Sequence, residues 1–218
     1  MRQCVMGEKG TTMTKLSAGA AVLAVIAVLG ATAWVALSPN AEDAFAACGA
    51  GQVAGGAAAI GGPFTLVDQT GKTVTDAEVI TRPTLIYFGY AFCPDVCPVD
   101  NARNAEAVDI LEERGLDVNL VFVSVDPGRD TPEALAEYAA NLHPRMVALT
   151  GTDDQISKAS QAYKAYFKVQ DSGDEFYLVD HSTFTYLMLP DTGFADFFRR
   201  EVTPDEMADR VACFIGEA

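Results

Sequence analysis

The chain has 218 residues, carries a formal net charge of −15 at neutral pH and is half apolar. This length supports one domain of ordinary size and leaves a further segment to explain. The excess of negative charge argues against a nucleic-acid-binding protein and indicates either a cationic partner or simple solubility.

An uncharged stretch lies near the start of the chain. Ala18 to Leu37 contains no charged side chain and is rich in Ala, Val and Leu, long enough for a helix that spans a bilayer. Arg2, Lys9 and Lys15 precede it, and basic residues stay on the cytoplasmic side of a membrane. The sequence therefore predicts a cytoplasmic N-terminus at 1–17 and a transmembrane anchor at 18–37, with the rest of the chain facing outward.

A cleaved signal peptide is the alternative for this segment, because Ala44 to Ala46 resembles a small-residue cleavage site. That site lies well beyond the apolar stretch, which is longer than a typical signal core, so we favour the uncleaved anchor. Residues 38–60 are dense in Ala and Gly without apolar periodicity, which predicts a flexible linker. The folded domain is expected at 61–218.

The domain is predicted to begin with a short hairpin, formed by Phe64–Val67 and Lys72–Thr75. The apolar run Thr84–Tyr90 then predicts a central strand, Val99–Arg114 a helix that ends at a glycine, and Val118–Val125 a buried parallel strand. A strand–helix–strand crossover is implied.

The second half continues the alternation and then breaks it. The predicted elements are a helix from Asp130 to Leu142, a strand Met146–Leu149, a helix from Thr152 to Phe167, strands Thr183–Leu189 and Phe194–Phe198, and a final helix from Thr203 to Ile215. An inserted hairpin is expected before the late strands, with Val169–Gln170 and Phe176–Val179 around the acidic turn Asp171–Glu175. The fold class is α/β, a mixed sheet flanked by helices.

Two cysteines four positions apart, Cys93 and Cys97, follow the central strand. Backbone N–H groups and the helix dipole at such a junction favour thiolate over thiol. Pro98 suits the first position of a helix, so we expect the pair in a turn just ahead of it, close enough for a disulfide or for two bonds to one metal ion. A buried structural pair is the alternative.

The chain has two histidines, His143 and His181. His181 lies at a predicted strand end that the sheet could bring beside the cysteines, whereas His143 follows a helix and resembles a helix terminator. Two thiolates and one imidazole form a soft site suited to Cu(I), tolerable for Cu(II) and possible for Zn(II). Asp180 and Asp95 are candidates to orient His181 or to fill a weak further position.

Four motifs are separated along the chain: Phe88–Pro98, Ser124–Pro132, Leu149–Thr152 and Tyr177–His181. Together they resemble the motifs of the Sco/SenC family of copper-binding proteins, and the resemblance extends over about 61–215. It implies a thioredoxin-like fold, with Cys93, Cys97 and His181 as ligands of copper in its Cu(I) and Cu(II) states. It also implies that Asp171–Glu175 belongs to a loop near the site.

The resemblance further implies a membrane-anchored copper chaperone that helps to assemble the CuA centre of cytochrome c oxidase. Its partners would be the oxidase subunit that carries CuA, a copper donor and a thiol reductant. The expected location is a bacterial inner membrane with the domain in the periplasm, or a mitochondrial inner membrane with the domain in the intermembrane space.

A thiol-disulfide oxidoreductase is the main alternative, with Cys93 and Cys97 as a redox-active dithiol that keeps the CuA-site cysteines reduced. This reading needs no histidine. A peroxiredoxin is disfavoured, because the threonine that such enzymes place before their reactive cysteine is absent. Cys48 and Cys213 have no place in the family pattern and are expected to pair with each other, to be free, or to cap an oxidation-sensitive surface.

Overall fold

The structure is a computed structural model, and it describes residues 59–170, 173 and 176–217 together with Ala27, Leu29 and Cys48. The predicted anchor at 18–37 and the segments on either side of it lie almost entirely outside these residues. Among the helices that the structure describes, none combines the length and the apolar character needed to cross a bilayer. The anchor and the linker therefore stay predictions.

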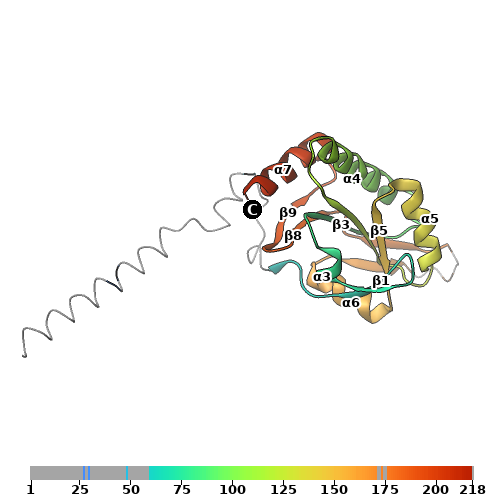
Figure 1. The fold of residues 1–218 in the computed structure, drawn as a ribbon. Coiled ribbons are helices and arrows are strands. Elements are labelled where there is room, and N and C mark those ends of the chain that lie inside the picture. The colour runs from blue at the N-terminus through green and yellow to red at the C-terminus, as the bar shows by residue number, and fades with distance from the viewer. Residues whose placement is uncertain are drawn as a thin grey trace, which may run out of the picture. The chain divides into compact units, whose positions relative to one another are not determined.

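A seven-stranded mixed sheet forms the centre of the domain (Figure 1). In spatial order its strands are β2 (Thr73–Thr75), β1 (Thr65–Asp68), β5 (Met146–Thr150), β4 (Asn119–Ser124), β3 (Thr84–Gly89), β8 (Thr185–Leu189) and β9 (Gly193–Phe198). β5, β4 and β3 run parallel, and the other neighbouring pairs are antiparallel. Every residue of β3 is buried, as its continuous apolar run predicted.

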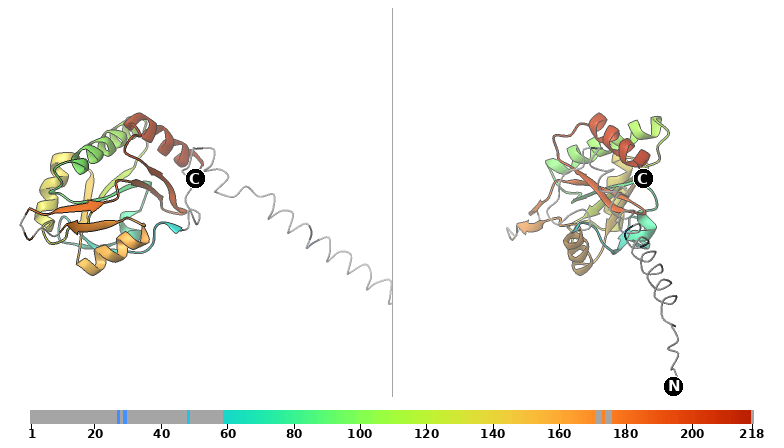
Figure 2. Two further views of the ribbon diagram at one scale, coloured as in Figure 1. Left: turned by 180° about the vertical axis from the view of Figure 1, so that it is seen from behind. Right: turned by 90° about the vertical axis from the view of Figure 1, so that its left-hand side faces the viewer.

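Helices cover both faces of this sheet (Figures 1 and 2). They are α3 (Asp76–Val79), α4 (Val96–Glu113), α5 (Pro132–Leu142), α6 (Asp153–Ala162) and α7 (Pro204–Glu217). α4 packs against α5 and α7 on one side, and α3 and α6 lie on the other. The parallel strands β3, β4 and β5 thus end at one edge of the sheet, where α4, α5 and α6 begin.

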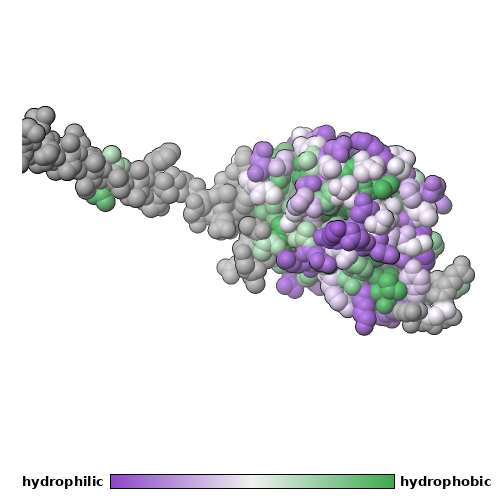
Figure 3. All heavy atoms as spheres, turned by 90° about the horizontal axis from the view of Figure 1, so that it is seen from below, coloured by the Kyte–Doolittle hydropathy of each residue, from purple (hydrophilic) through white to green (hydrophobic). Residues whose placement is uncertain are grey.

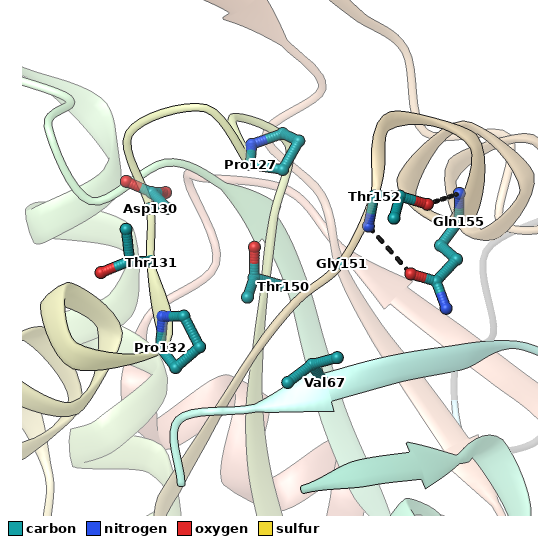
Figure 4. A pocket seen from close by; sticks show the side chains of 9 residues that line it. All are labelled: Val67, Pro127, Asp130, Thr131, Pro132, Thr150, Gly151, Thr152 and Gln155. Atoms are coloured by element: carbon teal, nitrogen blue, oxygen red, sulfur yellow. Dashed lines mark hydrogen bonds between the residues drawn. The ribbon is translucent and has the colours of Figure 1, made fainter. Parts of the chain in front are cut away.

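Capping residues set the starts of the later helices, as the sequence predicted. Thr152 and Gln155 form a reciprocal capping box at α6, drawn as dashed lines in Figure 4, and Thr203 pairs in the same way with Glu206 ahead of α7. Each box satisfies two backbone N–H groups that would otherwise lack a partner at the helix end.

The predicted end of the helix at Phe167 is wrong, because α6 ends at Ala162. Lys164 takes a left-handed backbone conformation with φ 54, which stops the helix. Phe167 then begins strand β6 (Phe167–Gln170). The mostly apolar stretch 163–167 suits the end of a helix as well as the approach to a strand, so the sequence pattern alone could not distinguish the two.

The inserted hairpin is confirmed as a separate two-stranded sheet, β6 (Phe167–Gln170) and β7 (Leu178–His181). Phe167 lies opposite His181 in its register. Of the predicted acidic turn at 171–175, only Gly173 lies within the described residues. This hairpin is not hydrogen-bonded into the main sheet as a further strand, so side-chain contacts must hold it in place.

Cys48 and Cys213 form a disulfide, which settles one of the three possibilities for these residues. The bond joins the segment ahead of the domain to α7. Met207, Ala208, Val211 and Phe214 form the buried stripe of the same helix, at the spacing of an amphipathic α-helix. The disulfide and this stripe together attach α7 to the domain.

Candidate metal centre

The two free cysteines of the described chain lie where β3 passes into α4. Cys93 precedes the helix as predicted. The prediction that Cys97 also lies ahead of the helix is wrong, because α4 begins at Val96 and not at Pro98 or Val99, which places Cys97 in its first turn. The first four N–H groups of a helix have no partner inside it, so Pro98 is tolerated at the third position as well as at the first. The earlier start turns the N–H of Cys97 toward Cys93.

The sulfurs and the imidazole of His181 converge. Candidate ligand atoms of Cys93, Cys97 and His181 all lie within 4.8 Å of one another. Nε2 of His181 is 3.2 Å from Sγ of Cys97, and the backbone N–H of Cys97 lies 3.5 Å from Sγ of Cys93. The hairpin thus brings His181 beside Cys97, although the two residues are 84 positions apart in the chain.

Neighbouring groups fix the orientation of the imidazole. Nδ1 of His181 donates to the carbonyl oxygen of Ser182 at 2.9 Å, so Nε2 is the nitrogen that faces the thiols. The rings of Tyr87 and Tyr90 meet the imidazole edge-on at 6.0 and 5.8 Å between centroids. A hydrogen bond to the second ring nitrogen is the usual way in which proteins orient a metal-binding histidine.

Hydrogen bonds and burial set the ionisation of the three groups. The Cys93 thiolate accepts from the Cys97 thiol, and this bond, with further ones from His181 and from backbone N–H groups, lowers the pKa of Cys93 well below that of a free thiol despite burial. The hydrogen bond that the Cys97 thiol donates to Cys93 favours the protonated form of Cys97, and together with burial it raises the pKa of Cys97. Burial is the largest single influence on His181 and by itself would lower its pKa. Hydrogen bonds to Cys93 and Ser182 and the charge of the Cys93 thiolate together outweigh burial and raise the pKa.

This arrangement fits a soft metal ion. Two sulfurs and one imidazole nitrogen are the ligands that copper prefers in proteins, and Cys93 is already in the thiolate form that binds metal. Metal that binds Cys97 must displace its proton, so binding couples to proton release. The same dithiol can also attack a disulfide, because Cys93 supplies the nucleophilic thiolate.

The two carboxylates proposed as helpers do not contact the imidazole. Asp180 accepts a hydrogen bond from Gln170 across the hairpin, and the carbonyl of Ser182 occupies the place proposed for it. Asp95 is the residue just ahead of α4, and the metal-ligand cluster found among the described residues contains no carboxylate. His143 ends α5 as predicted and pairs with Asp109.

The sequence reading missed several residues that shape the site. The hydroxyl of Tyr90 donates to Cys93, and the hydroxyl of Tyr87 lies within hydrogen-bonding reach of Cys97 while it donates to Asp100 at 2.9 Å. Gly89 is required at its position, because an added Cβ would lie 2.8 Å from Sγ of Cys97. Only their nearness to the cysteine motif could have drawn attention to them.

Asp130 is a further residue that the sequence reading left without a role. It is fully buried at the carboxyl edge of the sheet, where Figure 4 shows it beside Thr131 and Pro132. Its Oδ2 accepts hydrogen bonds from the N–H of Ala91 and from the hydroxyl of Ser124. Asp130 therefore ties the loop that carries Cys93 to the end of β4.

Comparisons with known proteins agree with this site and fold. A family model described as SCO1/SenC matches residues 52–216. Protein SenC of Rhodobacter capsulatus is 54% identical over 202 residues, which cover 93% of this chain and 91% of that protein. The human mitochondrial protein SCO1 homolog is 38% identical over 156 residues, 70% of this chain and 52% of that protein. The chain thus spans nearly all of one relative and about half of the other.

Solved structures support the same assignment. Arabidopsis thaliana ScoI with copper bound matches with a TM-score of 0.70 at 40% identity, over 73% of this chain and 100% of that chain. Yeast Sco1 with copper bound matches with a TM-score of 0.65 at 35% identity, over 71% and 87%. The fold is the thioredoxin-like α/β fold that the sequence predicted. With a family model that covers most of its length and relatives at this level of identity, the chain belongs to the SCO1/SenC family.

Proposed function

We propose that this protein binds copper through Cys93, Cys97 and His181 and delivers it to the CuA site during assembly of cytochrome c oxidase. The observation that carries the proposal is the convergence of two sulfurs and one imidazole nitrogen within 4.8 Å. Support also comes from the copper held by related solved structures. Copper is the cargo in this function, taken up at the site and passed on.

The second candidate function is reduction of the CuA-site cysteines by the same dithiol. It is favoured by the Cys93 thiolate, whose low pKa suits attack on a disulfide. Net reduction would oxidise Cys93 and Cys97 to a disulfide and would need a thiol reductant to restore them. The two functions are compatible, because a cysteine must be reduced before it can bind copper.

Both functions need protein partners at the site. Figure 3 shows hydrophobic patches among hydrophilic ones on one face of the domain. Exposed apolar side chains also lie near the ligands in the chain: Phe92 directly precedes Cys93, Val99 follows Cys97 in α4, and Leu178 opens β7. Such side chains suit transient contact with the oxidase subunit that carries CuA and with a copper donor. An anchor at 18–37 would keep these encounters at the membrane.

His181→Ala separates the two functions, because it removes a nitrogen ligand and leaves both thiols. A copper carrier should lose Cu(II) binding with its thiolate-to-copper absorption, and should lose oxidase maturation with it. A pure dithiol reductase should keep its activity in this variant and lose it in Cys93→Ser and Cys97→Ser.

The measurements are copper spectra, partner-thiol reduction and oxidase assembly on all three variants. If His181→Ala matures the oxidase as well as the wild type does, copper delivery is wrong and the reductase function takes its place.

A further inference from the structure

The third candidate ligand, His181, lies on a hairpin that is held against the domain by its side chains, with Val179 in the core. We use the name His181 hairpin for β6 and β7, which form their own two-stranded sheet. A lone two-stranded hairpin is marginally stable in water. The distance between His181 and the dithiol therefore depends on the side chains that fasten this hairpin to the domain.

Arg129 makes one of these contacts. Its guanidinium carbon lies 3.6 Å from the ring centroid of Tyr177, the residue just before β7. Only 17% of the Arg129 side chain is exposed, so this cation–π contact is largely removed from water, where such contacts are strongest. Arg129 thus packs against the residue just ahead of β7, the strand that ends at His181.

Asp126 binds both partners of this cation–π contact. It accepts a hydrogen bond from Nε of Arg129 at 2.5 Å and another from the hydroxyl of Tyr177 at 2.6 Å. Its side chain is 3% exposed, so both bonds lie out of water. The arginine, the tyrosine and the carboxylate form one connected unit.

The same arginine also reaches the loop that carries Cys93. Its guanidinium carbon is 5.6 Å from the ring centroid of Tyr90 and 5.5 Å from that of Phe92. The hydroxyl of Tyr90 in turn accepts from the backbone N–H of Val179 in β7 and donates to Cys93. Arg129 therefore contacts both ligand-bearing segments at once.

We propose that Arg129 is a positioning residue that holds the His181 hairpin over the Cys93–Cys97 dithiol. It contacts none of the three candidate ligands and acts through Tyr177, Tyr90 and Phe92. The neighbouring residue Asp130 accepts a hydrogen bond from the N–H of Ala91, in the loop that carries Cys93. This loop therefore has a second support that does not involve the hairpin. Loss of Arg129 should accordingly release His181 more than it disturbs the cysteines.

Because Arg129 supports His181 more than the two cysteines, its loss should affect the two oxidation states of copper differently. This expectation rests on the function proposed above. Two thiolates suffice to attract Cu(I), whereas Cu(II) gains more from an imidazole nitrogen. The contacts of Arg129 therefore influence the relative affinities of the site for Cu(I) and Cu(II). Release of the hairpin should lower the affinity for Cu(II) and leave that for Cu(I) nearly unchanged.

The test compares Arg129→Met, Arg129→Lys and Tyr177→Leu in the full chain with the Cys48–Cys213 bond intact. Arg199→Met is the matched control, because Arg199 also lies over two rings, Phe184 and Phe197, at 5.7 and 5.8 Å. Hydrogen exchange of the copper-free reduced protein is measured first. In Arg129→Met and Tyr177→Leu, amides of β7 should exchange about tenfold faster or more, with the main sheet unchanged.

Copper titrations follow on the same proteins. Arg129→Met should bind Cu(II) about tenfold more weakly and Cu(I) within about twofold of the wild type. Its thiolate-to-Cu(II) absorption should move toward that of His181→Ala. Arg129→Lys keeps the positive charge beside Asp126, so its Cu(II) affinity should lie between those of the wild type and Arg129→Met. Arg199→Met should bind both forms of copper as the wild type does.

Unchanged exchange in β7 of Arg129→Met would overturn the proposal. Equal losses of Cu(I) and Cu(II) binding with faster exchange across the main sheet would also overturn it, because they would show general support of the fold. If the wild type itself takes up no copper, the proposed function fails, and the exchange measurement still decides whether Arg129 holds the hairpin.

Discussion

Asp130 is a buried acid whose ionised form holds the loop ahead of Cys93. Burial raises the pKa of Asp130 to about 6, even though hydrogen bonds from Ser124 and from the N–H of Ala91 favour the carboxylate. Its Oδ1 finds no hydrogen-bond partner among the described residues, so the charge is incompletely compensated. The residue keeps the loop in place at a cost in stability that depends on pH.

Asp130→Asn should remove this pH dependence. The folded-state pKa lies above the unfolded value of 3.8, so the wild type is favoured when Asp130 is protonated and loses that advantage as pH rises through about 6. Relative to Asp130→Asn, its free energy of unfolding should fall by up to about 3 kcal/mol between about pH 3, below both pKa values, and about pH 8, above both. Urea unfolding of both proteins at several pH values measures this, and a difference that stays constant with pH would contradict it.

At the scale of elements, the apolar runs and capping pairs of the sequence predict most of the sheet and its helices. The strands at 84–90 and 118–125 and the helix start at Thr152 follow from local patterns that burial and capping then enforce. The end of α6 could not be predicted in this way, because residues 163–167 carry an apolar pattern that suits either a helix or the strand they enter. The four-residue helix α3 was too short for a periodic signal.

The bond between Cys48 and Cys213 was one of three open possibilities, because pairing cannot be deduced from two positions in a sequence. Its removal tests how the segment ahead of the domain contributes to stability. Cys48→Ser and Cys213→Ser should each lower the free energy of unfolding by about 2–5 kcal/mol, and the double variant should lose little more.

Calorimetry of the single and double variants measures this, with copper uptake as the control that should not change. Losses that simply add in the double variant would mean that the two cysteines act independently and are not bonded.

At the scale of the whole molecule, the fold brings together a helix start and a hairpin that lie far apart in the chain. The sequence predicted that a sheet of this order could place His181 near the cysteines, and the structure confirms that placement. It could not predict what holds the hairpin there, because the contacts of Arg129 and Asp126 cross between loops and leave no periodic pattern. The candidate ligands can be recognised from local sequence patterns, whereas the distances between them depend on the tertiary structure.

The most direct test of copper binding is an anaerobic titration of the full chain in two redox states of Cys93 and Cys97. With the dithiol reduced, the protein should bind one copper per chain, because two thiolates and the imidazole are available. With Cys93 and Cys97 joined in a disulfide, uptake should be abolished. Equal copper uptake by the reduced and the oxidised protein would contradict the assignment of this site.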